Sequence, residues 1–249
     1  MKILAVIPAR GGSKGLPGKN LRPFMGLPLI AHSILFARSC PEFDRLVVST
    51  EDTEIAAVAR SFGAEAPFSR PPELARDETP LWEVVRHALE EVERQESAPY
   101  EQVALLDPTS PAREPADIQR AVALLRDHPA ADGVVGVSQP DFNPIWHCVI
   151  EQNGWMVNLM EEASRFDRRQ EVRPVYRING SLYLWRGLFV RREKRSWRLT
   201  GKHLIHEIPE MRAMSIDTQE EFERAEVLVK AGLIRFPWLV GGVGVPCRL

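Results

Sequence analysis

The chain begins with an apolar segment that runs directly into a loop rich in glycine and positive charge. Residues 3–7 are all apolar, and a run of this length is typical of a buried strand. Residues 8–21 then contain four glycines, two prolines and three cations. A packed core cannot hold three cations so close together, because each would need a charged partner away from water. The sequence therefore predicts a strand whose carboxyl end opens into an exposed cationic loop.

The composition of this loop is typical of a phosphate-binding site. Glycine lets backbone N–H groups approach an anion, while lysine and arginine supply positive charge. Two common patterns do not fit: Ser13 and Asn20 break the Walker pattern around Lys19, and no G-x-G-x-x-G is present. A polyphosphate site is the favoured interpretation, and a basic surface loop is the alternative. The candidate ligands of a phosphate are Arg10, Gly11, Gly12, Ser13, Lys14 and Lys19.

Strand-like and helix-like segments alternate along the chain. The predicted strands are residues 3–7, 45–50, 102–106, 133–137 and 181–185, with a further segment at 214–216. The predicted helices are residues 28–38, 53–62, 80–92, 115–125 and 218–230, the second of them capped by Asp52 or Thr53. This order predicts an α/β fold with a Rossmann-like three-layer α/β/α arrangement and a mostly parallel sheet. Ligands of such sheets bind beyond the carboxyl ends of the strands, where we place the turns after Ile7, Leu106 and Ile216.

Length and composition favour a single domain over residues 1–249, interrupted by an insertion at about 141–177. The formal net charge of −2 gives no reason to expect nucleic-acid binding. Three widely spaced cysteines form neither a disulfide framework nor a zinc pattern, and no apolar run is long enough for a membrane span. We therefore expect a cytoplasmic protein. His32 lies on a predicted helix, and we expect it to be structural.

Several segments resemble one enzyme family. Residues 7–21, IPARGGSKGLPGKNL, resemble the signature loop of the acylneuraminate cytidylyltransferases, which include the CMP-sialic acid synthetases and, more distantly, the CMP-Kdo synthetases. The other matching segments are residues 69–77 (SRPPELARD), 105–113 (LLDPTSPAR), 169–170 (RQ), 177–180 (RING) and 216–222 (IDTQEEF). The resemblance extends over the chain to about Lys230.

The resemblance implies a nucleotidyltransferase that transfers CMP from CTP to the hydroxyl of a 2-keto sugar acid and releases pyrophosphate. Cations that tighten on the transition state would stabilise the charge on the leaving group. The residues that would take part in catalysis are Arg10, Lys14, Lys19 and Asp217. Those expected near the nucleotide are Ala9, Arg10, Gly11, Gly12, Ser13, Lys19, Asn20, Arg70 and Asp107.

The resemblance also implies a metal ion, Mg²⁺ or Mn²⁺, and here the chain departs from the family pattern. Asp217 is the first candidate ligand, and a helix-capping role is its alternative. The family often has D-I-D-T, where this chain has Ser215 in place of the first aspartate, and many members have glutamine where this chain has Asp107. We hypothesise that Asp107 supplies the missing carboxylate. Its alternatives are a general base for the attacking hydroxyl and a hydrogen-bond partner of the sugar acid.

The acceptor carboxylate needs its own cations. The candidates are Arg113, Arg169 and Arg177, with surface ion pairs, or helix capping for Arg113, as alternatives. Gln170 and Asn179, which lie in the matching segments, are expected to bind the acceptor as well. In the resembling family the insertion builds a homodimer interface and reaches toward the partner's active site, and a surface hairpin is the alternative. The sequence also leaves open a phosphonate or other small acid as acceptor, a sugar 1-phosphate nucleotidyltransferase, and a regulatory module that binds a nucleotide without catalysis. The apolar tail at 236–246 could be packed, swapped or disordered.

Overall fold

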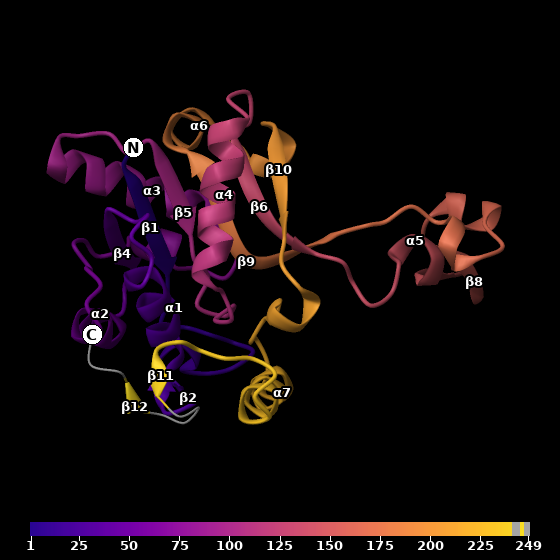
Figure 1. Cartoon of the computed structure of the whole chain (residues 1–249), viewed down its shortest axis with the longest axis horizontal. Helices are drawn as coiled ribbons and strands as arrows, with labels where there is room; N and C mark the ends of the chain where they lie inside the picture. Colours follow the sequence, from indigo (N-terminus) through magenta and orange to yellow (C-terminus); the bar gives the residue numbers. More distant parts are fainter. Residues whose placement is uncertain (241–244, 247–249) are drawn as a thin grey trace.

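The computed structural model describes residues 1–240 and 245–246 and is built on a central six-stranded sheet (Figure 1). Its strand order is β10-β6-β9-β5-β1-β4. These strands are β1 Ile3–Pro8, β4 Arg45–Ser49, β5 Gln102–Leu105, β6 Gly133–Ser138, β9 Arg177–Arg186 and β10 His203–Glu207. β1 runs parallel to β4 and β5, and β10 runs parallel to β6, whereas β9 is antiparallel to both neighbours. The predicted mostly parallel sheet is confirmed, with one reversed strand.

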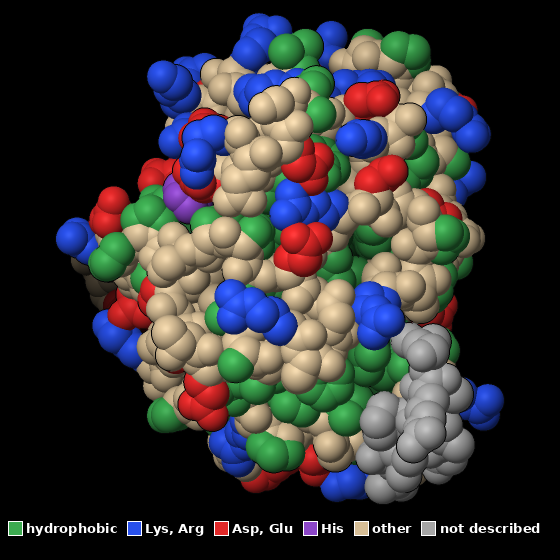
Figure 2. Space-filling model, turned by 90° about the vertical axis from the view of Figure 1, so that its left-hand side faces the viewer, with side chains coloured by type: hydrophobic (Ala, Val, Ile, Leu, Met, Phe, Trp, Pro, Cys, Tyr) green, Lys and Arg blue, Asp and Glu red, His purple; other side chains and the backbone are tan. Residues whose placement is uncertain are grey.

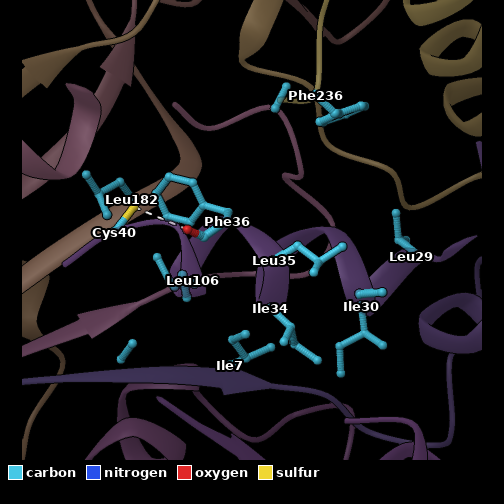
Figure 3. Close-up of a cluster of buried hydrophobic side chains, with 14 of the residues drawn as sticks. Ile7, Leu29, Ile30, Ile34, Leu35, Phe36, Cys40, Leu106, Leu182 and Phe236 are labelled. Carbon is cyan, nitrogen blue, oxygen red and sulfur yellow. Dashed lines mark hydrogen bonds between the residues drawn. The ribbon is translucent and has the colours of Figure 1, made fainter. Parts of the chain in front are cut away.

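Helices cover both faces of the sheet. They are α1 Leu29–Arg38, α2 Thr53–Ser61, α3 Leu81–Glu96, α4 Pro115–Asp127, α6 Gly187–Arg192 and α7 Gln219–Lys230. Side chains alternate along β1, so that Ile7 belongs to the cluster formed with α1, α2, α4 and α7, while Val6 belongs to the cluster formed with α3 and α6. Figure 3 shows α1 with Ile7 of β1 and Leu106, the residue after β5, on one side and Phe236 on the other. The predicted three-layer α/β/α arrangement is confirmed.

Local signals set the helix starts. The Asp52 carboxylate accepts hydrogen bonds from the N–H groups of Glu54 (2.8 Å) and Ile55 (3.0 Å) and caps α2, as predicted. Thr218 and Glu221 form a capping box at the start of α7. Asp217 is therefore not the cap of this helix, and the capping alternative for Asp217 is wrong.

The predicted strands differ from the structure at three places. Residues 214–216 form no strand, although the Ile216 N–H donates to the Thr109 carbonyl at 2.9 Å. β10 was not predicted, because it is an edge strand with two histidines and a glutamate, and its apolar residues are only partly covered. β9 begins at Arg177 rather than at 181. The segment before Asp217 thus lies beside the sheet and not in it.

The insertion at 141–177 projects from one side of the molecule (Figure 1). It contains the short helix α5 Pro144–His147 and a hairpin of β7 Val149–Gln152 and β8 Trp155–Asn158, joined through Asn153 and Gly154 at positive φ. We call residues 141–177 the lobe. Trp155 and Met156 on its hairpin are 76% and 75% exposed, so the lobe presents apolar side chains to its surroundings.

Part of the C-terminal tail is packed. Phe236, Trp238 and Leu239 are buried against the α1 side of the core, whereas residues 241–244 and 247–249 lie outside the described part. Short antiparallel pairs join β2 Pro23–Phe24 to β3 Leu27–Pro28 and β11 Leu239–Val240 to β12 Val245–Pro246. The 3-10 turns are η1 Lys19–Leu21, η2 Pro72–Leu74, η3 Glu161–Arg165, η4 Arg169–Glu171, η5 Trp197–Leu199 and η6 Glu210–Arg212.

Acidic and basic side chains are interspersed on the face shown in Figure 2, in keeping with the small net charge. Within the described residues, every helix is too short or too polar to cross a membrane.

Candidate active site

A cavity of about 260 Å³ lies beyond the carboxyl ends of β1 and β5. Three segments far apart in the sequence enclose most of it: the loop after β1, the turn after β5 and the residues just before α7. The lining residues are Pro8, Arg10, Ser13, Lys14, Gly15, Lys19, Asn20, Arg70, Leu81, Asp107, Pro108, Thr109 and Asp217. The predicted convergence of these three segments is found in the structure.

The loop after β1 is held in shape by its own contacts. Asn20 is buried, and its side-chain amide donates to the Arg10 carbonyl at 2.9 Å. The Ala9 N–H donates to the Ser49 carbonyl at 3.0 Å, which ties the loop to the end of β4. A Cβ atom at Gly15 would lie 2.6 Å from the Asp217 carbonyl oxygen, so this position requires glycine. The loop is thereby packed directly against the segment that carries Asp217.

Each cation of the loop is bound to a carboxylate. Lys19 Nζ lies 2.5 Å from Asp217 Oδ1, and both Arg10 and Lys14 form ion pairs with Asp77. Hydrogen bonds from Lys14 and then Arg10 lower the pKa of the Asp77 carboxyl. Asp77 was missed as a site residue, although it is the last residue of the matching segment 69–77 and that position was the signal available in the sequence.

Asp217 is oriented by two donors. Its Oδ1 is bound by Lys19, and its Oδ2 accepts a hydrogen bond from the Ser215 hydroxyl at 2.7 Å. Burial would raise the pKa of Asp217, but the contacts with Lys19 and Ser215 outweigh burial and lower it. The residue that replaces the family's first aspartate therefore orients the second one, and Asp217 is ionised at neutral pH.

Asp107 lies across the cavity at the end of β5. Its Oδ1 accepts hydrogen bonds from the N–H (3.0 Å) and the hydroxyl (2.9 Å) of Thr109, an arrangement that closes the turn. No group of three or more metal-binding side chains occurs in the described residues. Asp107 and Asp217 are the two carboxylates that line the cavity, and two suffice for an ion such as Mg²⁺ that keeps several waters.

Arg70 reaches the cavity from a buried position. It is 3% exposed, its Nε donates to the Ser49 hydroxyl at 3.2 Å, and its Nη1 lies 3.9 Å from Glu51. Burial lowers the pKa of Arg70 to about 10, so the guanidinium keeps its charge at neutral pH. Glu51 also accepts a hydrogen bond from the Gly11 N–H at 2.8 Å, and sequence reasoning gave no signal for this contact.

Two predicted acceptor ligands are structural instead. Arg113 is 1% exposed and donates to the carbonyls of Ser181 and Asp107 and to the Ser33 hydroxyl. Asn179 is 3% exposed; its amide nitrogen donates to the Ser138 hydroxyl, and its amide oxygen accepts the Ser181 N–H. The predictions for both residues are wrong, because each is enclosed by the sheet and has its polar groups directed to protein atoms. α4 is capped by Glu114 and Asp117, so Arg113 is not a helix cap either.

The remaining acceptor candidates lie away from the cavity. Arg177 is engaged by Glu210 through a bidentate ion pair. Arg169 and Gln170 lie in η4 on the lobe, where Arg169 lines a separate hollow with Gln139 and Asn143. The structure does not bring Arg169, Gln170 or Arg177 to the lining of the cavity of their own chain.

The cationic loop at the end of the first strand lines one cavity together with Asp107 and Asp217, and this arrangement defines an α/β protein suited to binding a polyphosphate. A family model described as cytidylyltransferase matches residues 4–230, and the chain belongs to this family.

Relatives of known name agree with this assignment. The chain is 38% identical over 186 residues to a CMP-N,N'-diacetyllegionaminic acid synthase of Legionella pneumophila, covering 74% of this chain and 78% of that one. It is 30% identical over 230 residues to a pseudaminic acid cytidylyltransferase of Campylobacter jejuni, covering 92% and 97%. A solved CMP:2-keto-3-deoxy-manno-octonic acid synthetase in complex with CTP shares the fold, with a TM-score of 0.70, 18% identity and coverage of 93% and 100%.

Proposed function

We propose that this protein transfers CMP from CTP to the hydroxyl group of a 2-keto sugar acid of the sialic acid type. The observation that carries the proposal is the convergence of Arg10, Lys14 and Lys19 with Asp107 and Asp217 around one cavity, in a chain of the cytidylyltransferase family. The named relatives support the choice of acceptor, because the legionaminic and pseudaminic acid enzymes are similar over most of the chain.

The main requirement of the reaction is to stabilise the negative charge that builds up on the leaving pyrophosphate. The acceptor hydroxyl gives up its proton to the solvent while its oxygen forms a bond to the α-phosphorus. The bond from the α-phosphorus to the bridging oxygen breaks, and pyrophosphate leaves with that electron pair. Arg10, Lys14 and Lys19 would bind the phosphate oxygens and stabilise the growing negative charge. Asp77 and Asp217 form ion pairs with these cations, and phosphate oxygens, which are also negative, would take the place of these carboxylates.

A divalent cation, Mg²⁺ or Mn²⁺, is part of the proposal. Asp217 would be its first ligand and Asp107 its second, because both are oxygen donors that line the cavity. The ion would neutralise part of the triphosphate charge. A structure with CTP and Mg²⁺ tests the role of Asp107: a separation above about 5 Å from the ion would contradict ligation, since Mg–O distances are near 2.1 Å. Asp107 would then be a base or an acceptor contact.

The acceptor site is proposed to need two chains. Arg169 and Gln170 lie on the lobe, so we propose that a homodimer brings them to the cavity of the other copy. Mixing chains inactivated by Lys19→Met with chains inactivated by Arg169→Ala tests this arrangement. One site of each mixed dimer would have both residues, and activity would partly return. An inactive mixture, in which mixed dimers have been confirmed, would contradict the shared acceptor site.

We propose that the protein is located in the cytoplasm, since CTP is available there.

Pyrophosphate release tests the reaction itself. The wild-type chain is incubated with each of the four nucleoside triphosphates and with a panel of 2-keto sugar acids, small phosphonates and sugar 1-phosphates. We expect release only with CTP and a sugar acid, and a loss of about 10²–10³ in kcat for Lys19→Met. Pyrophosphate release with CTP and a phosphonate, but with no sugar acid, would show that the acceptor is a phosphonate. CTP binding without release for any acceptor would favour a regulatory module.

A further inference from the structure

The connection between β10 and α7 carries Asp217 but lies outside the sheet. Its first residue, Ile208, donates a backbone hydrogen bond to the end of β6 at 2.8 Å, and Ile216 donates to the Thr109 carbonyl at 2.9 Å. Between these points the segment forms the turn η6 and no strand. Side-chain contacts are therefore needed to hold the part of the chain between these two points, which leads to Asp217.

Arg177 holds this segment from the start of β9, at the base of the lobe. Its Nε lies 2.9 and 3.1 Å from the two carboxylate oxygens of Glu210, and its Nη2 lies 2.7 Å from Oε1. Nη2 also donates to the Ala213 carbonyl at 2.9 Å, four residues before Asp217. A bidentate arginine–carboxylate pair fixes orientation as well as distance. Arg177 thus binds the segment through both a side chain and the backbone.

A second ion pair holds the other side of η6. Arg212 Nη1 lies 2.7 Å from Asp117 Oδ2, and Nη2 lies 3.1 Å from Oδ1. Asp117 is 3% exposed and lies in the first turn of α4. Two arginine–carboxylate pairs therefore hold η6 between β9 and α4. η6 supplies the carboxylate of the first pair and the arginine of the second.

We propose that Arg177 and Glu210 are positioning residues for the transfer reaction and that they set the place of Asp217 in the cavity. Arg177 acts through Asp217 and does not bind the acceptor carboxylate. Because Arg177 is also the last residue of the lobe, one side chain fixes both the base of the lobe and the segment that carries Asp217. The kinetic part of this inference rests on the proposed function, whereas its structural part does not.

Three variants test the inference. Arg177→Gln and Glu210→Gln should each lower kcat about tenfold, with the KM values for CTP and acceptor within about twofold of wild type, since misplacing a catalytic group affects the transition state most. The double variant should be no worse than either single one, because both remove the same contact. Glu65→Gln is the matched control: it breaks the bidentate Arg45–Glu65 pair at the far edge of the sheet and should leave kcat unchanged.

Amide hydrogen exchange supplies a measurement that does not need activity. Exchange at residues 213–217 should become faster in Arg177→Gln and Glu210→Gln and stay at the wild-type rate in Glu65→Gln. Unchanged exchange would overturn the inference even if the wild-type protein proved to have another activity. A rise in acceptor KM for Arg177→Gln, with Glu210→Gln like wild type, would also overturn it and identify Arg177 as an acceptor ligand.

Discussion

At the scale of single residues, the cations of the loop after β1 are all paired with carboxylates of the same chain. The cations after β1 are bound to Asp77 and Asp217, two carboxylates that come from different parts of the chain. Carboxylates and phosphates present similar oxygens to arginine and lysine. We therefore propose that Asp77 competes with the phosphates for Arg10 and Lys14. The loop of Asp77 precedes α3, whose first residue Leu81 lines the cavity.

Replacing Asp77 tests this competition. Asp77→Asn should lower the dissociation constants of CTP and pyrophosphate by about threefold, since exposed ion pairs are individually weak. Isothermal titration calorimetry measures both constants. Glu78→Gln is the matched control, because it removes the same charge from the neighbouring position, which makes no ion pair with a described residue. Weaker binding by Asp77→Asn would contradict competition and show that Asp77 instead organises the loop.

At the scale of elements, the start of α4 is held by a buried carboxylate. Asp117 accepts hydrogen bonds from Arg212, from His206 (3.2 Å) and from the Glu114 N–H (2.8 Å). Burial alone would raise the pKa of Asp117, but these donors outweigh burial and lower it to about 2. One carboxyl thus joins α4, β10 and η6.

The pH dependence of stability follows from this pKa. A carboxyl whose folded-state pKa lies below its ordinary value of about 4 makes its full contribution to the stability of the folded protein above pH 4. This contribution is lost as the pH falls toward 2. We expect about 2 kcal/mol from Asp117 in this window. Unfolding in denaturant between pH 7 and 2 measures the free energy of unfolding. The difference in this free energy between wild type and Asp117→Asn should shrink as the pH falls. Asp127→Asn at the exposed end of α4 is the control, and an equal pH trend for both variants would contradict the assignment.

The tail forms a second buried polar contact. Trp238 Nε1 donates to His32 Nδ1 at 3.1 Å, while His32 Nε2 faces the Phe24 carbonyl at 2.9 Å. Burial lowers the pKa of His32 to about 4, so the ring is neutral and carries its proton on Nε2. The expected structural role of His32 fits this position.

Trp238→Phe should therefore cost about 1–3 kcal/mol of unfolding free energy, because it leaves the His32 nitrogen buried without a donor. Chemical unfolding at neutral pH measures the loss. A change below about 0.5 kcal/mol, the usual range of surface substitutions, would contradict the packing of the tail on α1.

At the scale of the whole molecule, the lobe projects away from the sheet and its helices (Figure 1). Its hairpin exposes Trp155 and Met156, and it carries Arg169 away from the cavity. Large exposed apolar side chains that lie together are typical of interaction surfaces. These features support the proposed dimer.

Trp155→Glu should weaken this dimer, since a charge would be buried in the interface. Sedimentation velocity over a range of protein concentrations should show a shift toward the monomer. Leu199→Glu is the matched control: Leu199 is also 75% exposed but lies on η5, outside the lobe, and its variant should sediment like wild type. A wild-type protein that is monomeric at all concentrations would contradict the proposal.

Much of the fold could be predicted from local patterns. The apolar run of β1, the cap at Asp52 and the helical spacing of α1 and α4 are properties of neighbouring residues, and the structure agrees with them to within a few positions. β10 could not be predicted, because an edge strand with one partner needs little apolar surface.

The sequence by itself determined the cationic loop, the class of fold and the place of Asp107 beyond a strand end, because each depends on residue order and on the common edge of parallel strands. Asp217 also lines the cavity as predicted, but residues 214–216 form no strand, so contacts made in the tertiary structure bring it there. Only the tertiary structure decided which arginines remain open to a ligand. Arg113 and Arg177 look alike in the sequence, yet one is enclosed by the sheet and the other is held by Glu210. Burial and pairing arise from residues distant in the chain, so the local sequence does not encode them.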